Sequence, residues 1–269
     1  MTRFLKYQFN LMLLAVSFFT RLPVPAAIDY SPRKLHQAGR YFPLVGWLLA
    51  AFLSAFYCFM LPQLGITPTV CLLIIISLIL TGAIHEDGLA DTADGFWGGQ
   101  TIARKLAIMK DSQIGTYGTC ALICALLTKF VLLSSLAADQ HLLLALGIAY
   151  PLSRGLAISH VQHLPYARQN SDNSKSRPFA QPMQPRVLLW LFASSVPAVL
   201  WLPLSSAILV LVSACVLRFA LKYWFKKHIS GYTGDCLGFA QQVQELLIYL
   251  LLIVTLPKTV NEQTIGFLL

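Results

Sequence analysis

Long apolar stretches, each close to the length of a membrane-spanning helix, recur along most of this sequence. A helix needs about 20 apolar residues to cross a hydrocarbon core of about 30 Å. Lipid admits only helices and closed barrels, and the sustained alternation of barrel strands is not seen. The sequence therefore predicts an all-α, polytopic membrane helical bundle that forms a single domain over residues 1–269. The stretches cover approximately residues 41–60, 68–84, 116–137, 142–159, 187–203, 206–225 and 237–256, which predicts seven spans.

The composition agrees with a membrane protein and excludes other classes. Hydrophobic residues make up 57% of the chain and charged residues only 12%, and so apolar a chain does not stay disordered. The net charge of +9 is typical of basic cytoplasmic loops. Without a basic stripe interleaved with aromatic residues, it does not indicate nucleic-acid binding. The six cysteines form no Cys-x-x-Cys motif, so we expect neither disulfides nor a zinc site.

The N-terminal segment shares some features with a signal peptide. Arg3 and Lys6 precede an apolar run over residues 11–19, but an arginine and two prolines follow in place of a small-x-small cleavage site. We therefore expect an uncleaved membrane segment that spans the bilayer, re-enters it or lies at its interface.

Lysine and arginine gather in alternate loops. Because positive loops stay in the cytoplasm, the sequence predicts a multi-pass protein of the cytoplasmic (inner) membrane with its C-terminus outside. The N-terminal segment does not fit this alternation, because Arg3 and Lys6 favour the cytoplasm and the next loop, 21–40, is also cytoplasmic. The pattern therefore fits either seven spans with an interfacial or re-entrant N-terminal helix, or eight spans. Most lysines and arginines lie in loops 21–40, 85–115, 160–186 and 226–236, whereas the connections near 61–67, 138–141 and 204–205 have none.

The segment 85–115 opposes the positive trend of the other cytoplasmic loops, because its acidic residues outnumber its basic ones. Asp87, Asp91 and Asp94 stand at spacing i, i+4 and i+7, which places them on one face of a helix. Three like charges at that spacing repel one another, so a bound cation would stabilise them. Mg²⁺ suits carboxylates and prefers a few of them together with waters and substrate phosphates. The segment therefore predicts an acidic active-site loop with a metal-bridged diphosphate site, and a solvated acidic loop is the alternative.

Basic residues and glycines follow the acids. Arg104, Lys105 and Lys110 could hold phosphate oxygens that the metal leaves free. Gly115 and Gly118 open the next apolar stretch, where a glycine lets a phosphate approach backbone N–H groups. Close helix packing in the membrane explains such glycines equally well.

Several polar residues lie in or beside apolar stretches, where charges are costly and usually face a cavity or a partner. Arg154 is near the end of its stretch and either faces a site or snorkels to the interface. Lys129 lies deeper and has no evident partner, and Glu245 is expected to pair with a basic residue. Asp235 stands where the last stretch begins, and it either caps that helix or adds a carboxylate to the site.

These residues resemble the signature of the cobalamin synthase family. The most specific matches are the acidic motif HEDGLADTADG, from His85 to Gly95, and the motif MKDSQIGTYG, from Met109 to Gly118. Further matches extend through almost the whole chain and comprise Thr20 to Pro25, Arg40 to Gly46, Ser153 to Gly155, Pro165 to Arg168 and Thr233 to Gly238.

The resemblance implies an Mg²⁺-dependent membrane enzyme of cobalamin biosynthesis. Such enzymes join α-ribazole, or its 5′-phosphate, to adenosylcobinamide-GDP and release GMP. The implied partners are these small molecules, the lipid bilayer and other enzymes of the same pathway. A substitution at a diphosphate depends on positioning and charge neutralisation. The expected site residues are Glu86, Asp87, Asp91 and Asp94 as metal ligands, Lys110, Asp111, Ser112, Arg154 and Arg168 for substrate binding, and His85, Asp94 and Asp235 as candidate proton acceptors.

The chain departs from the family pattern at two places. Leucine is more common where Glu86 stands, so Glu86 either adds a ligand or faces water. The family's loop after Tyr166-Ala167-Arg168 tends to be glycine-rich, whereas residues 169–175 read QNSDNSK.

Other function classes fit the acidic segment less well. A CDP-alcohol phosphotransferase needs Asp-Gly followed by Ala-Arg, but Asp87-Gly88 is followed by LAD. An acid-rich prenyltransferase usually has two separate Asp-rich motifs, and Asp111 alone is a poor second one. An ion-coupled transporter needs carboxylates near the bilayer midplane and repeated halves, whereas here the acids lie mainly between apolar stretches and no repeat is visible.

Overall fold

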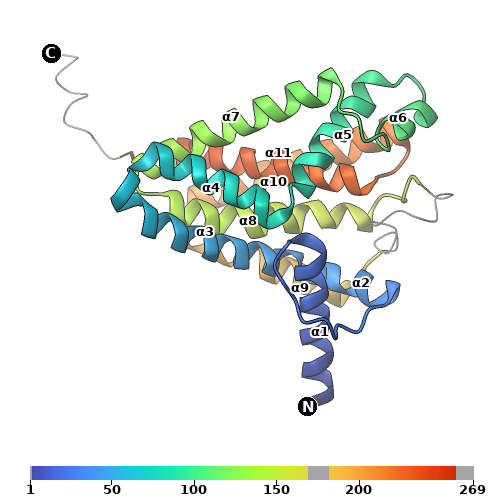
Figure 1. The fold of residues 1–269 in the computed structure, drawn as a ribbon, viewed down its shortest axis with the longest axis horizontal. Helices are drawn as coiled ribbons and strands as arrows, with labels where there is room; N and C mark the ends of the chain where they lie inside the picture. Colours follow the sequence, from blue (N-terminus) through green and yellow to red (C-terminus); the bar gives the residue numbers. More distant parts are fainter. Residues whose placement is uncertain (1, 169–181, 259–269) are drawn as a thin grey trace.

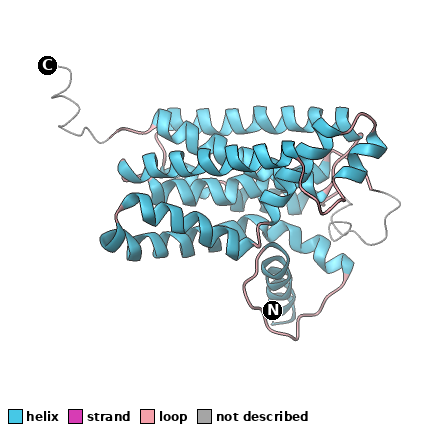
Figure 2. Cartoon of the chain, turned by 45° about the horizontal axis from the view of Figure 1, so that its top comes forward, coloured by secondary structure: helices cyan, strands magenta, loops and turns pink. Residues whose placement is uncertain are grey.

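The computed structural model describes residues 2–168 and 182–258, which fold into a bundle of α-helices (Figures 1 and 2). Within these ranges the β-like pairing is limited to an isolated bridge between Tyr166 and Tyr232. The predicted all-α fold is therefore confirmed. In chain order the elements are α1 (Thr2–Phe19), α2 (Pro32–Ala38), η1 (Gly39–Tyr41), α3 (Phe42–Leu64), α4 (Ile66–Thr81), α5 (Ile84–Gly98), α6 (Ile102–Ile108), α7 (Thr116–Ala138), α8 (Leu142–Ile158), η2 (Ser159–Gln162), α9 (Pro185–Ser195), η4 (Pro197–Trp201), α10 (Leu204–Ile229) and α11 (Gly234–Thr255).

Five helical segments of the described chain are long and apolar enough to cross a membrane. They contain α3, α7, α8, α10 and α11, and a sixth span is counted if α4 and α5, bent by 86° at their junction, cross together. The predicted count of seven is not confirmed. Residues 187–203 form the 11-residue helix α9 and the short 3-10 helix η4, because Pro197 has no N–H with which to continue α9.

The chain turns sharply between α4 and α5. Gly82 and Ala83 have positive φ values of 65° and 55°, a conformation that glycine accepts and that costs other residues about 1–2 kcal/mol. A side chain on Gly82 would collide with Arg21, whose N–H donates to Leu80 O at 2.6 Å. The turn directs α5 away from the axis of α4. The first half of the predicted acidic loop, residues 85–98, is therefore a helix.

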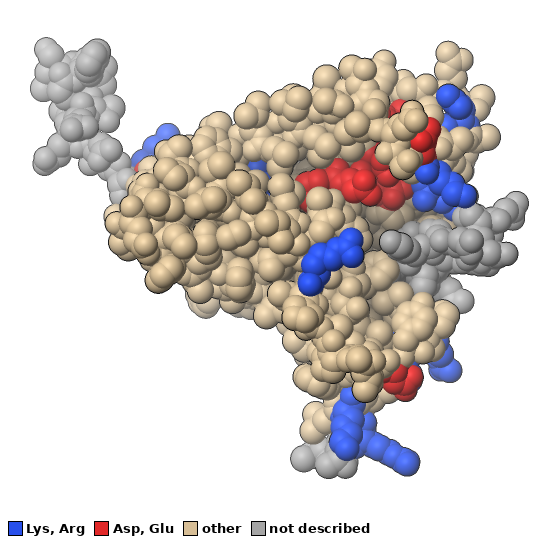
Figure 3. All heavy atoms as spheres, viewed as in Figure 1, with Lys and Arg blue, Asp and Glu red and all other residues tan. Residues whose placement is uncertain are grey.

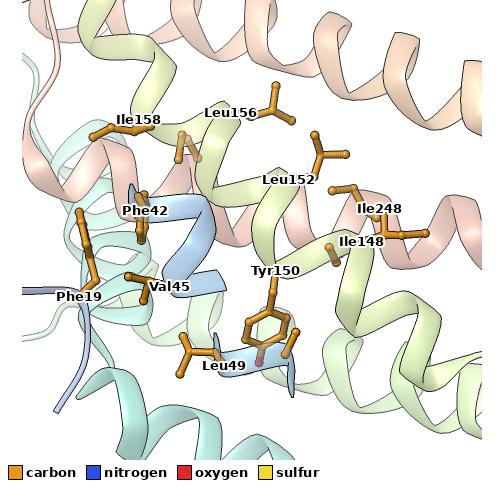
Figure 4. Packing of buried hydrophobic residues seen from close by; sticks show 14 of the residues in the cluster. Phe19, Phe42, Val45, Leu49, Ile148, Tyr150, Leu152, Leu156, Ile158 and Ile248 are labelled. Carbon is orange, nitrogen blue, oxygen red and sulfur yellow. The ribbon is translucent and has the colours of Figure 1, made fainter. Parts of the chain in front are cut away.

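The core that positions this helix forms between α3, α8 and α11. α8 is buried along almost its whole length, and Figure 4 shows Leu49 of α3 beside Tyr150 of α8. Gly46 lets the two backbones come close, because a Cβ there would lie 2.6 Å from Tyr150 O. Lipid tails are as apolar as this core, so close packing and polar contacts hold such a bundle together.

α1 crosses the direction of the spanning helices near one end of the bundle (Figure 1). Its second half is packed against the protein, with Leu11, Leu14 and Ala15 buried. The Phe19 ring stacks on Phe42 at the start of α3, with ring centroids 3.8 Å apart. α1 is not among the helices that are apolar enough to span.

Candidate functional site

α5 crosses α11 at two glycines. A Cβ on Gly88 would lie 2.7 Å from Asp235 O, and a Cβ on Gly238 would lie 3.1 Å from His85 O. Small residues at a helix crossing allow two backbones to approach this closely. The crossing therefore holds the first turn of α11 against the face of α5 that carries the acidic residues.

Three carboxylates lie beside this crossing, and we call Asp87, Asp91 and Asp235 the acidic site. Asp87 is exposed, and Asp91 and Asp235 are partly buried. Asp91 lies near enough to Asp87 and Asp235 to be repelled by both, and near enough to Arg168 to be attracted by it. Figure 3 shows acidic side chains as a continuous band in a hollow of the face viewed, with basic side chains next to it. The sequence predicted Asp87, Asp91 and Asp94 on one face of a helix. α5 does carry all three, but only Asp87 and Asp91 lie in the acidic site, to which α11 adds a third carboxylate, whereas Asp94 is bound to the start of α7.

Arg168 and Thr233 both bind Asp235. Arg168 Nη2 donates to Asp235 Oδ2 at 2.8 Å and to Met109 O at 3.1 Å. Thr233 Oγ1 donates to Asp235 Oδ2 at 3.2 Å and accepts from Cys236 N, which makes Thr233 the N-cap of α11. Of the two interpretations of Asp235, the helix cap is wrong, and its carboxylate lies in the acidic site.

Asp94 binds the start of α7. Its Oδ2 accepts from Gly115 N at 2.7 Å and its Oδ1 from Gly118 N at 2.8 Å. A helix N-terminus stabilises an anion through its unpaired N–H groups and its dipole, and a Cβ on either glycine would collide with this carboxylate. The anion at this helix start is thus a side chain of the protein, where the sequence suggested a substrate phosphate.

Glu86 is buried against α11 and linked to the interior of the bundle. Its Oε1 accepts from Gln242 Nε2 at 2.9 Å, and its Oε2 has no hydrogen-bond partner among the described residues. Gln242 Nε2 also donates to Gln241 Oε1 at 2.8 Å, and Gln241 Nε2 donates to Glu245 Oε2 at 2.5 Å. Sequence reasoning missed both glutamines, although two adjacent amides in an apolar stretch were an available signal.

A buried charge cluster lies at the other end of this chain of amides, and we define it as Lys129, Arg154 and Glu245. Lys129 Nζ lies 2.7 Å from Glu245 Oε1, and Arg154 Nη1 lies 3.7 Å from Glu245 Oε2. The expected pairing of Glu245 with a basic residue is confirmed. Arg154 does not snorkel: it is 2% exposed and also donates to Tyr150 O at 3.0 Å.

The remaining predicted residues lie at different places. His85 is buried, with its ring stacked on Phe42 at a centroid distance of 5.7 Å. Lys110, Asp111 and Ser112 are exposed in the connection between α6 and α7. The four residues thus have different environments, since His85 lies in the interior and the other three are exposed.

Metal-binding capacity was predicted for the acidic segment. In the part of the chain that the structure describes, no three His, Cys, Asp or Glu side chains stand close enough together to hold a metal ion. The acidic site nevertheless has the donor chemistry that Mg²⁺ takes, which is one or two carboxylates completed by waters and substrate phosphates. Residues 169–175, where the sequence departs from the family pattern, lie outside the described residues.

Comparison with known proteins identifies the family. The sequence model of the family described as cobalamin-5-phosphate synthase matches residues 11–253. A protein of Pseudoalteromonas atlantica named adenosylcobinamide-GDP ribazoletransferase is 90% identical over 269 residues, the full length of both chains. Proteins with the same name from Vibrio cholerae and Vibrio parahaemolyticus are 44% and 47% identical, over 97% and 93% of this chain and 99% and 94% of theirs. No solved structure matches. The chain therefore belongs to the cobalamin-5-phosphate synthase family.

Proposed function

We propose that the acidic site is where this chain joins ribazole to adenosylcobinamide-GDP. The activity follows from the family and from the full-length relative that is 90% identical. The observation that supports the location is the crossing at Gly88 and Gly238, which gathers carboxylates from two helices beside Arg168. A site with charges of both signs in a surface hollow (Figure 3) suits a diphosphate that arrives with a divalent cation.

Asp87 and Asp91 would hold Mg²⁺ in this proposal. Bound there, the ion would neutralise the diphosphate and stabilise the departing phosphate of GMP. The repulsion that Asp91 experiences from its neighbours supports a cation at this point. Asp94 and Glu86, the other predicted ligands, already accept hydrogen bonds from the protein. We assign them positioning roles, with Asp94 fixing α7 and Glu86 fixing α11.

The side chains of the protein position the reactants and accept one proton. A ribose hydroxyl attacks the phosphorus that bears the cobinamide, so that a P–O bond to ribazole forms while the P–O bond to GMP breaks. Among the predicted proton acceptors we favour Asp235, because Asp94 has both oxygens engaged and His85 is stacked under Phe42. Arg168, held on Asp235 at 2.8 Å, would bind a phosphate oxygen next to it.

The orientation in the membrane is part of the proposal. The positive loops support an acidic site that faces the cytoplasm and a location in the inner membrane. Lys110, Asp111 and Ser112, exposed beside α6, would then meet the substrates as they arrive from the cytoplasm.

Turnover by the purified chain in liposomes tests the proposal. With adenosylcobinamide-GDP and α-ribazole supplied, we expect GMP release and corrinoid product to require Mg²⁺. Asp91→Asn should abolish turnover and leave membrane insertion intact. Asp139→Asn, at the other end of α7, is the matched control and should retain turnover. Wild-type turnover in the Asp91 variant would refute the site, and turnover that survives a chelator would refute the metal.

A further inference from the structure

The first half of α1 carries large apolar side chains that contact little of the protein. None of residues 3–10 is buried, and the Phe4 and Phe9 side chains are 64% and 61% exposed. The spanning helices also expose apolar residues, but these face the hydrocarbon core. Exposed apolar surface on a helix that is not apolar enough to be counted as a span indicates another contact, such as a partner or a lipid surface.

The exposed residues of this half of α1 separate into two faces. Arg3, Lys6 and Asn10 follow one another at spacings of three and four and form a narrow polar stripe. Leu5 and Phe9, four residues apart and both exposed, lie on another side of the helix. A helix with a basic stripe and an aromatic apolar face is typical of segments that lie in a membrane interface.

Hydrogen bonds fix the direction of α1. Tyr7 Oη donates to Gln37 Oε1 at 2.7 Å. The side chain of Asn10 binds both backbone groups of Asp29, at 2.9 and 3.0 Å. These bonds hold α1 across the axes of the spanning helices (Figure 1), and α1 would lose them if it turned to run parallel to those helices.

The packing at the end of α1 shows which end of the helical bundle α1 joins. Phe19 stacks on Phe42, the first residue of α3. Arg21 donates its N–H to Leu80 near the end of α4, and its side chain lies over Gly82. α1 therefore joins the bundle at the end where α3 begins and α4 finishes, which is also the end from which the acidic helix α5 departs.

The charge of this region indicates whether a lipid surface or a second copy of the chain covers the exposed half of α1. No acidic residue precedes Asp29, whereas Arg3, Lys6 and Arg21 are basic. A second copy of α1 would bring equal positive charges together, while anionic lipid headgroups would neutralise them. Charge complementarity thus favours a lipid surface.

We propose that α1 lies flat in the headgroup layer on the side of the acidic site and binds anionic phospholipids. Leu5 and Phe9 enter the boundary of the acyl chains, and Arg3 and Lys6 contact lipid phosphates. The N-terminus then lies on the face from which α3 starts, opposite to the predicted position of the C-terminus. Of the arrangements that the sequence allowed, this selects the interfacial helix.

The sidedness of the two ends of α1 tests its position. Small epitope tags before Met1 and after Ala27, in the exposed connection between α1 and α2, are probed by protease in sealed vesicles of known orientation. We expect both tags of the full-length chain to be cleaved from the same face. Cleavage from opposite faces would show that α1 spans and would overturn the proposal.

A fluorescence experiment tests the lipid contact. The N-terminal amine, which has a lower pKa than lysine and can be labelled selectively near neutral pH, receives an environment-sensitive dye. In nanodiscs that hold one copy each, we expect shielding of the dye from acrylamide, an uncharged quencher, to increase severalfold as anionic lipid replaces neutral lipid. Arg3→Gln/Lys6→Gln should abolish that increase, and Arg186→Gln on α9 should retain it.

The other outcomes are equally decisive. Shielding that is independent of lipid charge would refute binding of anionic headgroups. Shielding that is absent in single-copy nanodiscs and develops only at high protein density would assign the surface to a second copy of the chain. Because neither readout uses turnover, failure here is distinct from failure of the proposed catalytic site.

Discussion

Lys129 of α7 and Glu245 of α11 form an ion pair inside the bundle, with 2.7 Å between Nζ and Oε1 and both side chains almost wholly buried. Arg154 of α8 approaches the second oxygen of the same carboxylate. Glu86 is also near enough to Lys129 to attract its charge. Two cations and two carboxylates thus balance one another in a region where an unpaired charge is very costly.

Removing the shared carboxylate should destabilise the protein strongly. Glu245→Gln should lower the free energy of unfolding by about 3–5 kcal/mol, because breaking a buried pair leaves an uncompensated charge. Thermal unfolding in detergent measures the loss. In Lys129→Met/Glu245→Gln, the loss should be smaller than the sum of the two single losses. Strictly additive losses would show that the pair contributes no interaction energy.

The helix crossing at Gly88 should tolerate no side chain. A Cβ there would lie 2.7 Å from Asp235 O, so Gly88→Ala must push α11 away from α5. A misplacement of about 1 Å can lower turnover on the order of 100-fold. Gly147→Ala is the matched control in α8, because its Cβ would lie 3.8 Å from Trp47, an ordinary contact. Equal turnover in the two variants would contradict a role for the crossing.

We expect Asp94 to stabilise the start of α7 and not to serve as a metal ligand. Asp94→Asn replaces one accepting oxygen by an NH₂ group that faces Gly115 N or Gly118 N. Leaving a buried donor unpaired costs about 1–3 kcal/mol. Hydrogen exchange should therefore accelerate at residues 115–119. Unchanged exchange together with a higher Mg²⁺ requirement would instead make Asp94 a metal ligand.

We expect Mg²⁺ binding not to require the carboxylate of Glu86. Glu86→Gln keeps an oxygen that can accept from Gln242, so we expect the Mg²⁺ concentration for half-maximal turnover to stay unchanged. Titration of turnover with Mg²⁺ measures this value, and the wild-type chain titrated in parallel is the reference. A clear rise in the Mg²⁺ requirement of the Glu86 variant would show that Glu86 is a metal ligand.

Much of the architecture and part of the site could be predicted from local patterns in the sequence. The apolar stretches predicted α3, α7, α8, α10 and α11, since each pattern is contained within its own segment. The spacing of Asp87 and Asp91 likewise predicted a shared helix face, because a helix repeats every 3.6 residues. Both predictions depend on residues close in sequence.

Long-range contacts explain what the sequence could not reveal. Nothing in the run around Lys129 indicates that its partner is Glu245, more than a hundred residues away. The glycines at 115 and 118 have the pattern of an anion site, but only the fold brings Asp94 to them. The break in stretch 187–203 was foreseeable from Pro197, which hydropathy alone does not register.

The carboxylate that Lys129 and Arg154 share belongs to α11, the last helix that the structure describes. Protein synthesis proceeds from the N-terminus, so α7 and α8 enter the membrane before Glu245 exists. Until α11 follows, both cations lack the partner that makes their depth tolerable. The membrane insertion of these helices is therefore complete only when α11 has entered, and a chain that ends before α11 would leave Lys129 and Arg154 without the carboxylate of Glu245.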